Sequence, residues 1–315
     1  MKILSMSGFV PEHICDTVRF VQYSGRSRVS HYCGYASDFI AQVMEDDGID
    51  GAVFPKSCDS SRGISSYCGV SGKFLYQLAV PSRRDTAAIR YFAHSIEEYK
   101  VAVERHYGIE ITDGMMEERG TWLQRRNRQL KECYNCLDSI DYGSYLDGIH
   151  AMLQQPLMEQ EAPKLRENAR NEGKRVYLVG SFLSNSGLAY TIERCGMKIV
   201  GDNLTESKRL FSQQLAGGGG SIFENIAESI LGNKLSPTQN EFKEIVEGDL
   251  QEIQEKKVRG VIFLTQKYCE PYDYLYSVYK KALDAREIPA LKLAVADSMD
   301  QSGAELAMEA FADIL

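Results

Sequence analysis

The sequence predicts a parallel α/β protein with two domains. Short runs rich in Val, Ile and Phe, each bounded by Gly, Pro or Ser, alternate with helical patterns in both halves of the chain. A chain of 315 residues is also long for a single hydrophobic core, which favours two domains over one.

The first half contains short strand-like runs followed by a long helical segment. We expect strands at residues 2–8, 51–57 and 74–81 and a helix at residues 34–46. From Thr86 to about Leu153 apolar residues recur at three- and four-residue spacing, which predicts long amphipathic helices. Residues 155–173 are rich in charges and contain two prolines, so we expect the boundary there, between domains 1–155 and 156–315.

The second half resumes the alternation of strands and helices. We expect strands at residues 175–181, 197–202, 258–266 and 288–295, and helices at 187–196, 240–257, 273–285 and from Gln301 onward. The glycine run AGGGGS, residues 216–221, does not directly follow a strand and lacks the surrounding residues of a phosphate-binding motif. We therefore interpret it as a flexible loop.

Composition excludes several classes of function. A hydrophobic content of 43% is ordinary for a soluble globular protein. The net charge of -8 argues against nucleic-acid and anionic-membrane partners, which require a basic surface. The sequence shows neither a signal peptide nor an apolar stretch of about 18 residues, so we expect a cytoplasmic protein with reduced cysteines.

Two cysteines, each followed by an acid, lie just past a strand-like run. Cys58 follows GAVFP and Cys269 follows GVIFLTQ. Ligands of parallel α/β proteins collect at the carboxyl ends of strands, so these cysteines would meet in one cleft if the two domains face each other. Cys33 precedes a predicted helix, whose positive end favours a thiolate. The spacing matches no local zinc or ferredoxin motif, and burial as small hydrophobic residues is the alternative.

The other cysteines and the histidines are weaker candidates. Cys133 and Cys136 form a C-x-x-C inside a helical pattern, whereas thioredoxin-like motifs follow a strand, so we expect a packing role. Three further cysteines are interpreted as structural: Cys15, Cys68 and Cys195. No G-x-S-x-G motif occurs, and His31 is the histidine nearest to a candidate cysteine.

Several segments resemble one known family, the D-component family of 2-hydroxyacyl-CoA dehydratases, which includes subunits of benzoyl-CoA reductase. The resemblance is carried by CGYASDFIAQVMEDDGIDGAVFPKSCDSSRG, RVYLVGSFLSNSGLAYTIERCGMKIVGDNL, VRGVIFLTQKYCEPYDY and IPALKLAVADSMDQSGAE. It covers nearly the whole chain and implies two Rossmann-like (flavodoxin-like) parallel-sheet domains with a helical connection. Arg259 and the missing arginine in the last segment depart from the family pattern.

The resemblance also implies a cofactor. In this family three cysteines hold one [4Fe-4S] cluster, and by motif position they correspond to Cys33, Cys58 and Cys269. Thiolates suit iron as soft ligands, and the fourth iron would be open to a non-cysteine ligand. The resemblance assigns no catalytic residue, but three polar residues beside the cysteines are candidates for a catalytic role or for orienting the ligand loops, with helix capping as the alternative role: Asp59, Ser60 and Glu270.

The function implied by the resemblance is that of a subunit of a radical lyase or an iron-sulfur reductase. Such a subunit pairs with a homologous subunit in a homo- or heterodimer, receives an electron from an ATP-dependent iron-sulfur activator and acts on a CoA thioester. One alternative is a double-cubane reductase of small molecules, for which Cys68 is the nearest additional ligand. The other alternative is a partner subunit without catalytic activity.

Overall fold

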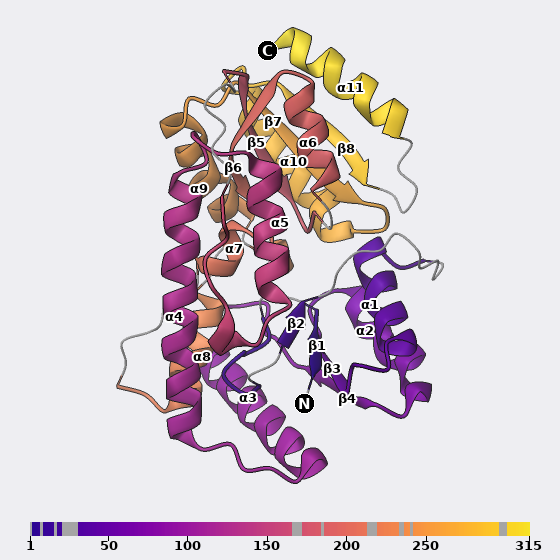
Figure 1. Cartoon of the computed structure of the whole chain (residues 1–315), viewed down its shortest axis with the longest axis vertical. Coiled ribbons are helices and arrows are strands. Elements are labelled where there is room, and N and C mark those ends of the chain that lie inside the picture. Colours follow the sequence, from indigo (N-terminus) through magenta and orange to yellow (C-terminus); the bar gives the residue numbers. More distant parts are fainter. Residues whose placement is uncertain are drawn as a thin grey trace.

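The computed structural model describes residues 2–6, 9–15, 18–20, 31–165, 172–183, 186–212, 219–232, 236–239, 242–295 and 301–315. These residues form two four-stranded parallel sheets and the helices that cover them. Figure 1 shows the two sheets at opposite ends of the molecule, with two long helices running beside both. The predicted α/β class with two parallel-sheet, Rossmann-like domains is confirmed.

The first sheet has the strand order β2-β1-β3-β4. Its strands are β1 (Ile3–Ser5), β2 (Val18–Phe20), β3 (Gly51–Pro55) and β4 (Phe74–Leu78). Helices α1 (Gly34–Glu45) and α2 (Asp59–Cys68) share a core with Ala52 and Phe54, while α3 (Thr86–Tyr107) shares the opposite core with Val53. Successive residues of β3 thus face opposite sides, and because both sides are covered the strand is apolar throughout.

The second sheet repeats this order as β6-β5-β7-β8. Its strands are β5 (Lys174–Gly180), β6 (Met197–Asn203), β7 (Gly260–Gln266) and β8 (Ala290–Val295). One face packs against α6 (Gly187–Arg194) and α11 (Gln301–Ile314), and the other against α9 (Phe242–Glu255) and α10 (Glu270–Asp284). The two central strands are thus β1 and β3 in the first sheet and β5 and β7 in the second, which are the first and third strands of each sheet in chain order.

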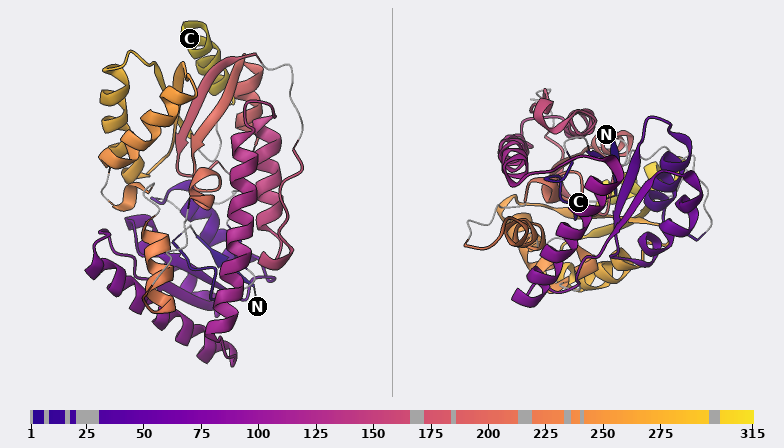
Figure 2. Two further views of the ribbon diagram at one scale, coloured as in Figure 1. Left: turned by 90° about the vertical axis from the view of Figure 1, so that its left-hand side faces the viewer. Right: turned by 90° about the horizontal axis from the view of Figure 1, so that it is seen from below.

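Several helices connect the core of the first sheet to the core of the second. Helix α4 (Asp113–Asn135) contributes Met116 to the core of the first sheet and Leu130 and Tyr134 to the core of the second, to which α5 (Tyr142–Leu153) also contributes. Helix α8 (Ile222–Leu231), although it follows β6 and the short α7 (Lys208–Phe211), packs against α3 in the core of the first sheet. Figure 2 shows α4 spanning both sheets. The chain thus crosses between the two sheets more than once.

Local sequence explains where these helices begin. The side chains of Asp85, Thr112 and Asp141 each accept a backbone N–H at the start of α3, α4 and α5, which satisfies a donor that the helix itself cannot pair. Helix α3 ends at Gly108, whose φ of 65° suits a glycine. None of the described helices is long and apolar enough to cross a membrane.

The predicted strands and helices agree with the structure to within a few residues at their ends. Sequence reasoning did not identify β2, α2 or α8 as separate elements. Of the predicted glycine-rich loop at residues 216–221, residues 216–218 lie outside the described part of the chain. The end of that run directly precedes α8, which Ser221 and Glu224 start with a reciprocal capping box.

Candidate functional site

Cys58 and Cys269 occupy equivalent places in the two sheets. Each is the third residue after the third strand of its sheet, β3 or β7, and each is the N-cap of the helix that follows. In each sheet this strand lies beside the first strand, where the direction of the strand order reverses. Such a switch point is where open α/β sheets bind ligands.

Cys33 reaches the same place from a helix that precedes β3. It is the N-cap of α1 and is buried. The backbone N–H of Tyr35, in the first turn of α1, donates a hydrogen bond of 2.8 Å to Oε1 of Gln266 at the end of β7. A side chain of the second sheet therefore caps a helix of the first, which fixes Cys33 relative to the strand that precedes Cys269.

The three cysteines line two adjoining cavities. The larger, which we call the outer cavity, has a volume of about 960 Å³ and is also lined by Asp59, Ser60 and Glu270. The smaller, which we call the inner pocket, has a volume of about 100 Å³ and is lined by more deeply buried residues of both sheets. The structure thus brings Cys33, Cys58 and Cys269 together at the junction of the two sheets.

Burial favours the protonated thiol at Cys33 and at Cys269. Burial raises the pKa of Cys33 to about 11, and the proximity of Cys58 adds to the effect. Burial also raises the pKa of the Cys269 thiol, with further contributions from Cys33 and Cys58. The sulfur atoms are therefore close enough to influence one another, and a bound metal centre would favour the thiolate form.

The spacing of the sulfur atoms does not match a single metal ion. Thiolates on one tetrahedral zinc ion lie about 3.8 Å apart, given a zinc–sulfur bond of about 2.3 Å. Among the described residues, the three sulfur atoms do not form a group in which all ligand atoms are within 4.8 Å of one another. Thiolates are the ligands that iron-sulfur clusters use, so the chemistry of these three donors is compatible with a cluster.

The polar candidates beside the cysteines differ in what they contact. The Ser60 side chain hydrogen-bonds with Cys33 and thereby opposes the rise of its pKa. Asp59 instead forms an exposed ion pair of 3.1 Å with Arg62. Glu270 is exposed at the start of α10, where its charge complements the helix dipole. Ser60 is therefore the candidate that touches a cysteine of the site.

Two residues beside the site have left-handed backbones. His31 has a φ of 74° and Tyr268 a φ of 66°, which are unfavourable for residues with a side chain. Their rings lie 6.3 Å apart between centroids, so they meet across the two halves of the chain. Residues held in such conformations cluster at functional sites.

The other cysteines lie away from the two cavities. Cys68 is fully buried in the core beneath α1 and α2 and lines neither cavity. The Cys15 thiol lies 3.5 Å from the Tyr99 hydroxyl in a second core. Cys133 is buried near the end of α4, and Cys136 is exposed at its C-cap.

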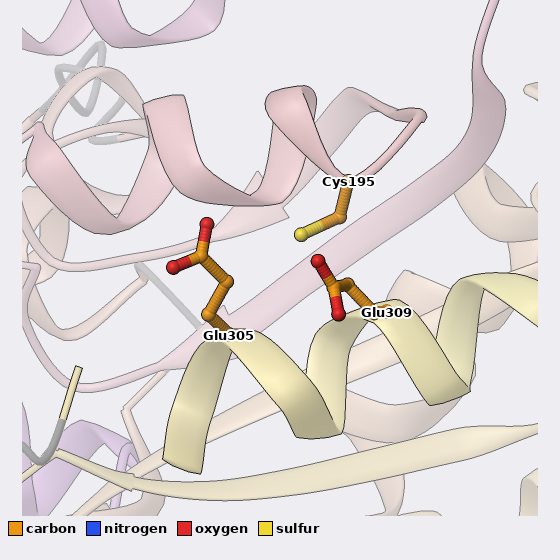
Figure 3. Close-up of side chains that lie close together, drawn as sticks. All are labelled: Cys195, Glu305 and Glu309. Carbon is orange, nitrogen blue, oxygen red and sulfur yellow. The ribbon is translucent and has the colours of Figure 1, made fainter. Parts of the chain in front are cut away.

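A separate group of metal-ligating side chains was missed by sequence reasoning. Figure 3 shows Cys195, at the C-cap of α6, facing Glu305 and Glu309 of α11. Their ligand atoms lie within 4.8 Å of one another, and the four-residue spacing of the glutamates was the available sequence signal. Glu305 already forms an ion pair of 3.3 Å with Arg194, and the group is far from complete burial. It belongs to neither cavity.

Comparison with known proteins gives one family and three relatives. The family model described as 2-hydroxyglutaryl-CoA dehydratase, D-component, matches residues 3–315. The chain is 26% identical to the beta subunit of (R)-2-hydroxyglutaryl-CoA dehydratase from Acidaminococcus fermentans, over 91% of this chain and 82% of the relative. It is 24% identical to the beta subunit of (R)-phenyllactyl-CoA dehydratase from Clostridium sporogenes, over 86% and 76%. It is 22% identical to a benzoyl-CoA reductase subunit from Thauera aromatica, over 71% and 63%.

Proposed function

The chain belongs to the 2-hydroxyglutaryl-CoA dehydratase D-component family, and on this basis we propose that it is an iron-sulfur subunit of a dehydratase or a related reductase. In this proposal Cys33, Cys58 and Cys269 hold one [4Fe-4S] cluster. The observation that carries the proposal is the convergence of three cysteine N-caps, from three helices of two sheets, on one cavity.

The local environment suits an anionic, thiolate-bound centre. The N-terminal ends of α1, α2 and α10 carry partial positive charge and N–H groups that have no partner within their own helix. The N–H of Ser61 already donates to the Cys58 sulfur over 3.5 Å. When bound, a cluster of this type supplies one-electron transfer and an iron that can act as a Lewis acid. The chain supplies the sulfur ligands, the hydrogen bonds to them and a largely buried surrounding.

The partners follow from the family. All three relatives are named as subunits of an enzyme, so we propose that this chain pairs with a homologous subunit. An ATP-dependent iron-sulfur activator would deliver the electron. The outer cavity, at about 960 Å³, is large enough for the reacting end of a CoA thioester.

The alternatives make different demands on the cysteines. A double-cubane centre needs further ligands, and the burial of Cys68 away from both cavities argues against its participation. A partner subunit without catalytic activity needs no cluster. Lyase and reductase activities share the same cysteine arrangement, so substrate turnover must separate them.

Iron and sulfide analysis of anaerobically purified protein tests the proposal. We expect roughly four irons and four sulfides per chain, and a loss of most of them in Cys58→Ala. The control is Cys136→Ala, since Cys136 is exposed at the end of α4. Roughly eight irons would favour the double-cubane alternative. Iron-free wild-type protein, or a Cys58→Ala variant that retains its iron, would contradict the proposal.

A further inference from the structure

The inner pocket contains two buried hydroxyl groups whose protons have no acceptor among the described residues. The Ser181 hydroxyl makes no hydrogen bond there, and the Tyr272 hydroxyl interacts with the Arg209 guanidinium, which can only donate. Both residues line the inner pocket, and Tyr272 is only 5% exposed. A buried polar group without a partner costs free energy, so such a group calls for a partner such as an ordered water, an ion or a ligand.

A buried cation lies on the same wall. Arg209 lines the inner pocket, is 8% exposed, and its guanidinium lies 5.4 Å from the centre of the Tyr272 ring. It is held in place by hydrogen bonds that it donates to the carbonyl oxygens of Gly180 and Asn203. Both acceptors are uncharged backbone groups, and together they orient the guanidinium.

The neighbouring acid does little to offset this charge at neutral pH. Burial raises the pKa of Glu206 to about 8, although Arg209 opposes the rise. At pH 7 most of the Glu206 carboxyl is therefore protonated and neutral. The wall formed by Arg209 and Tyr272 keeps a positive character as a result.

The remaining walls limit what the pocket accepts. Met6, Phe9 and Phe182 give it apolar sides. Its volume of about 100 Å³, against about 960 Å³ for the outer cavity, suits a short carbon chain with one carboxylate group. A bulky ligand or an extended polyanion does not fit.

We propose that the inner pocket binds a short-chain carboxylate beside the three cysteines. The hydroxyls of Tyr272 and Ser181 donate to its oxygens, Arg209 supplies the positive charge, and the apolar side chains contact its carbon chain. The inference rests on the proposed function only in assuming that the cysteines hold a cluster. The contacts made by Tyr272, Ser181, Arg209 and the apolar side chains do not involve iron.

Fluorine NMR of trifluoroacetate, a carboxylate of suitable size, tests the inference. We expect the wild-type protein to broaden the trifluoroacetate signal, and Tyr272→Phe to weaken binding about tenfold through the loss of one hydrogen bond to a charged group. This substitution keeps the ring against which the Arg209 guanidinium packs, so the fold is retained. Tyr274→Phe is the matched control, because Tyr274 lies on the same helix, is 64% exposed and lines only the outer cavity.

The measurement is made on the protein as isolated and again after removal of any iron. Binding that depends on Tyr272 in either form supports the inference, even if iron analysis contradicts the proposed cluster. The inference is overturned if wild-type protein leaves the signal sharp in both forms. It is equally overturned if Tyr272→Phe and Tyr274→Phe bind the probe as tightly as the wild type.

Discussion

Replacing Glu206 by Gln should change how the stability of the protein depends on pH. Glu206 is 3% exposed, and burial raises its pKa from 4.5 to about 8 despite hydrogen bonds from backbone N–H groups and the charge of Arg209; nearby Asp202 adds to the rise. The unfolded chain therefore loses this proton at a lower pH than the folded chain. The free energy of unfolding of the wild type should therefore fall as pH rises from 4.5 to 8. Above pH 8 the loss caused by Glu206 is complete.

The two pKa values give the size of the effect. The raised pKa of Glu206 lowers the free energy of unfolding by about 1.4 kcal/mol at pH 5.5 and by about 4 kcal/mol at pH 7.5. A glutamine carries no charge and keeps an oxygen that can accept the N–H of Leu183, as Glu206 does. The free energy of unfolding of Glu206→Gln minus that of the wild type should thus increase by about 2.5 kcal/mol between these pH values.

Urea unfolding of both proteins at pH 5.5, 6.5 and 7.5 measures this difference. The exposed Glu110 provides the control, since Glu110→Gln should shift stability equally little at each pH. A difference between Glu206→Gln and wild type that stays constant over this range would refute the reasoning. It would mean that the Glu206 carboxyl ionises as readily in the folded chain as in the unfolded one.

Three further substitutions test the packing that holds the site. In the wild type, Nη1 of Arg126 lies 2.7 Å from Oε2 of Glu12. Arg126→Ala leaves this buried carboxylate without its partner and should lower the free energy of unfolding by about 3–5 kcal/mol. A loss below about 1 kcal/mol in urea titrations would contradict this. Gln266→Leu removes the acceptor for the Tyr35 N–H and should cost about 1–3 kcal/mol and reduce iron retention, whereas the exposed Gln251→Leu should do neither. Ile262→Ala, at the centre of β7 and 0% exposed, should cost about 2–5 kcal/mol in thermal or urea unfolding; Ile314→Ala, 68% exposed, should be nearly neutral.

The elements that sequence reasoning located are those with a strong local signal. The apolar run of β3 and the spacing of α1 identify both, and the position of Cys58 and Cys269 after similar runs indicated that they belong to one site. Strand β2 was missed because three residues are too few to establish a period. Helix α8 was missed although its capping box, Ser221 with Glu224, was present in the sequence.

The inner pocket could not be predicted in the same way. Its features depend on residues that are distant in sequence, such as Gln266, which caps the helix that begins at Cys33. Arg209 and Tyr272 carry no pattern of their own, since a single arginine or tyrosine in a helix usually faces solvent or packs at a surface. Only the facing of the two sheets makes them neighbours of the cysteines.

The division of the cysteines between the two sheets gives the site a mechanical property. The first half of the chain supplies Cys33 and Cys58, and the second half supplies Cys269. Any group that needs all three sulfur atoms is held only while the two halves are in contact. Binding of that group therefore stabilises the contact between the halves. By the same reciprocity, a substitution that weakens contacts between the halves weakens retention of that group without altering a single ligand atom.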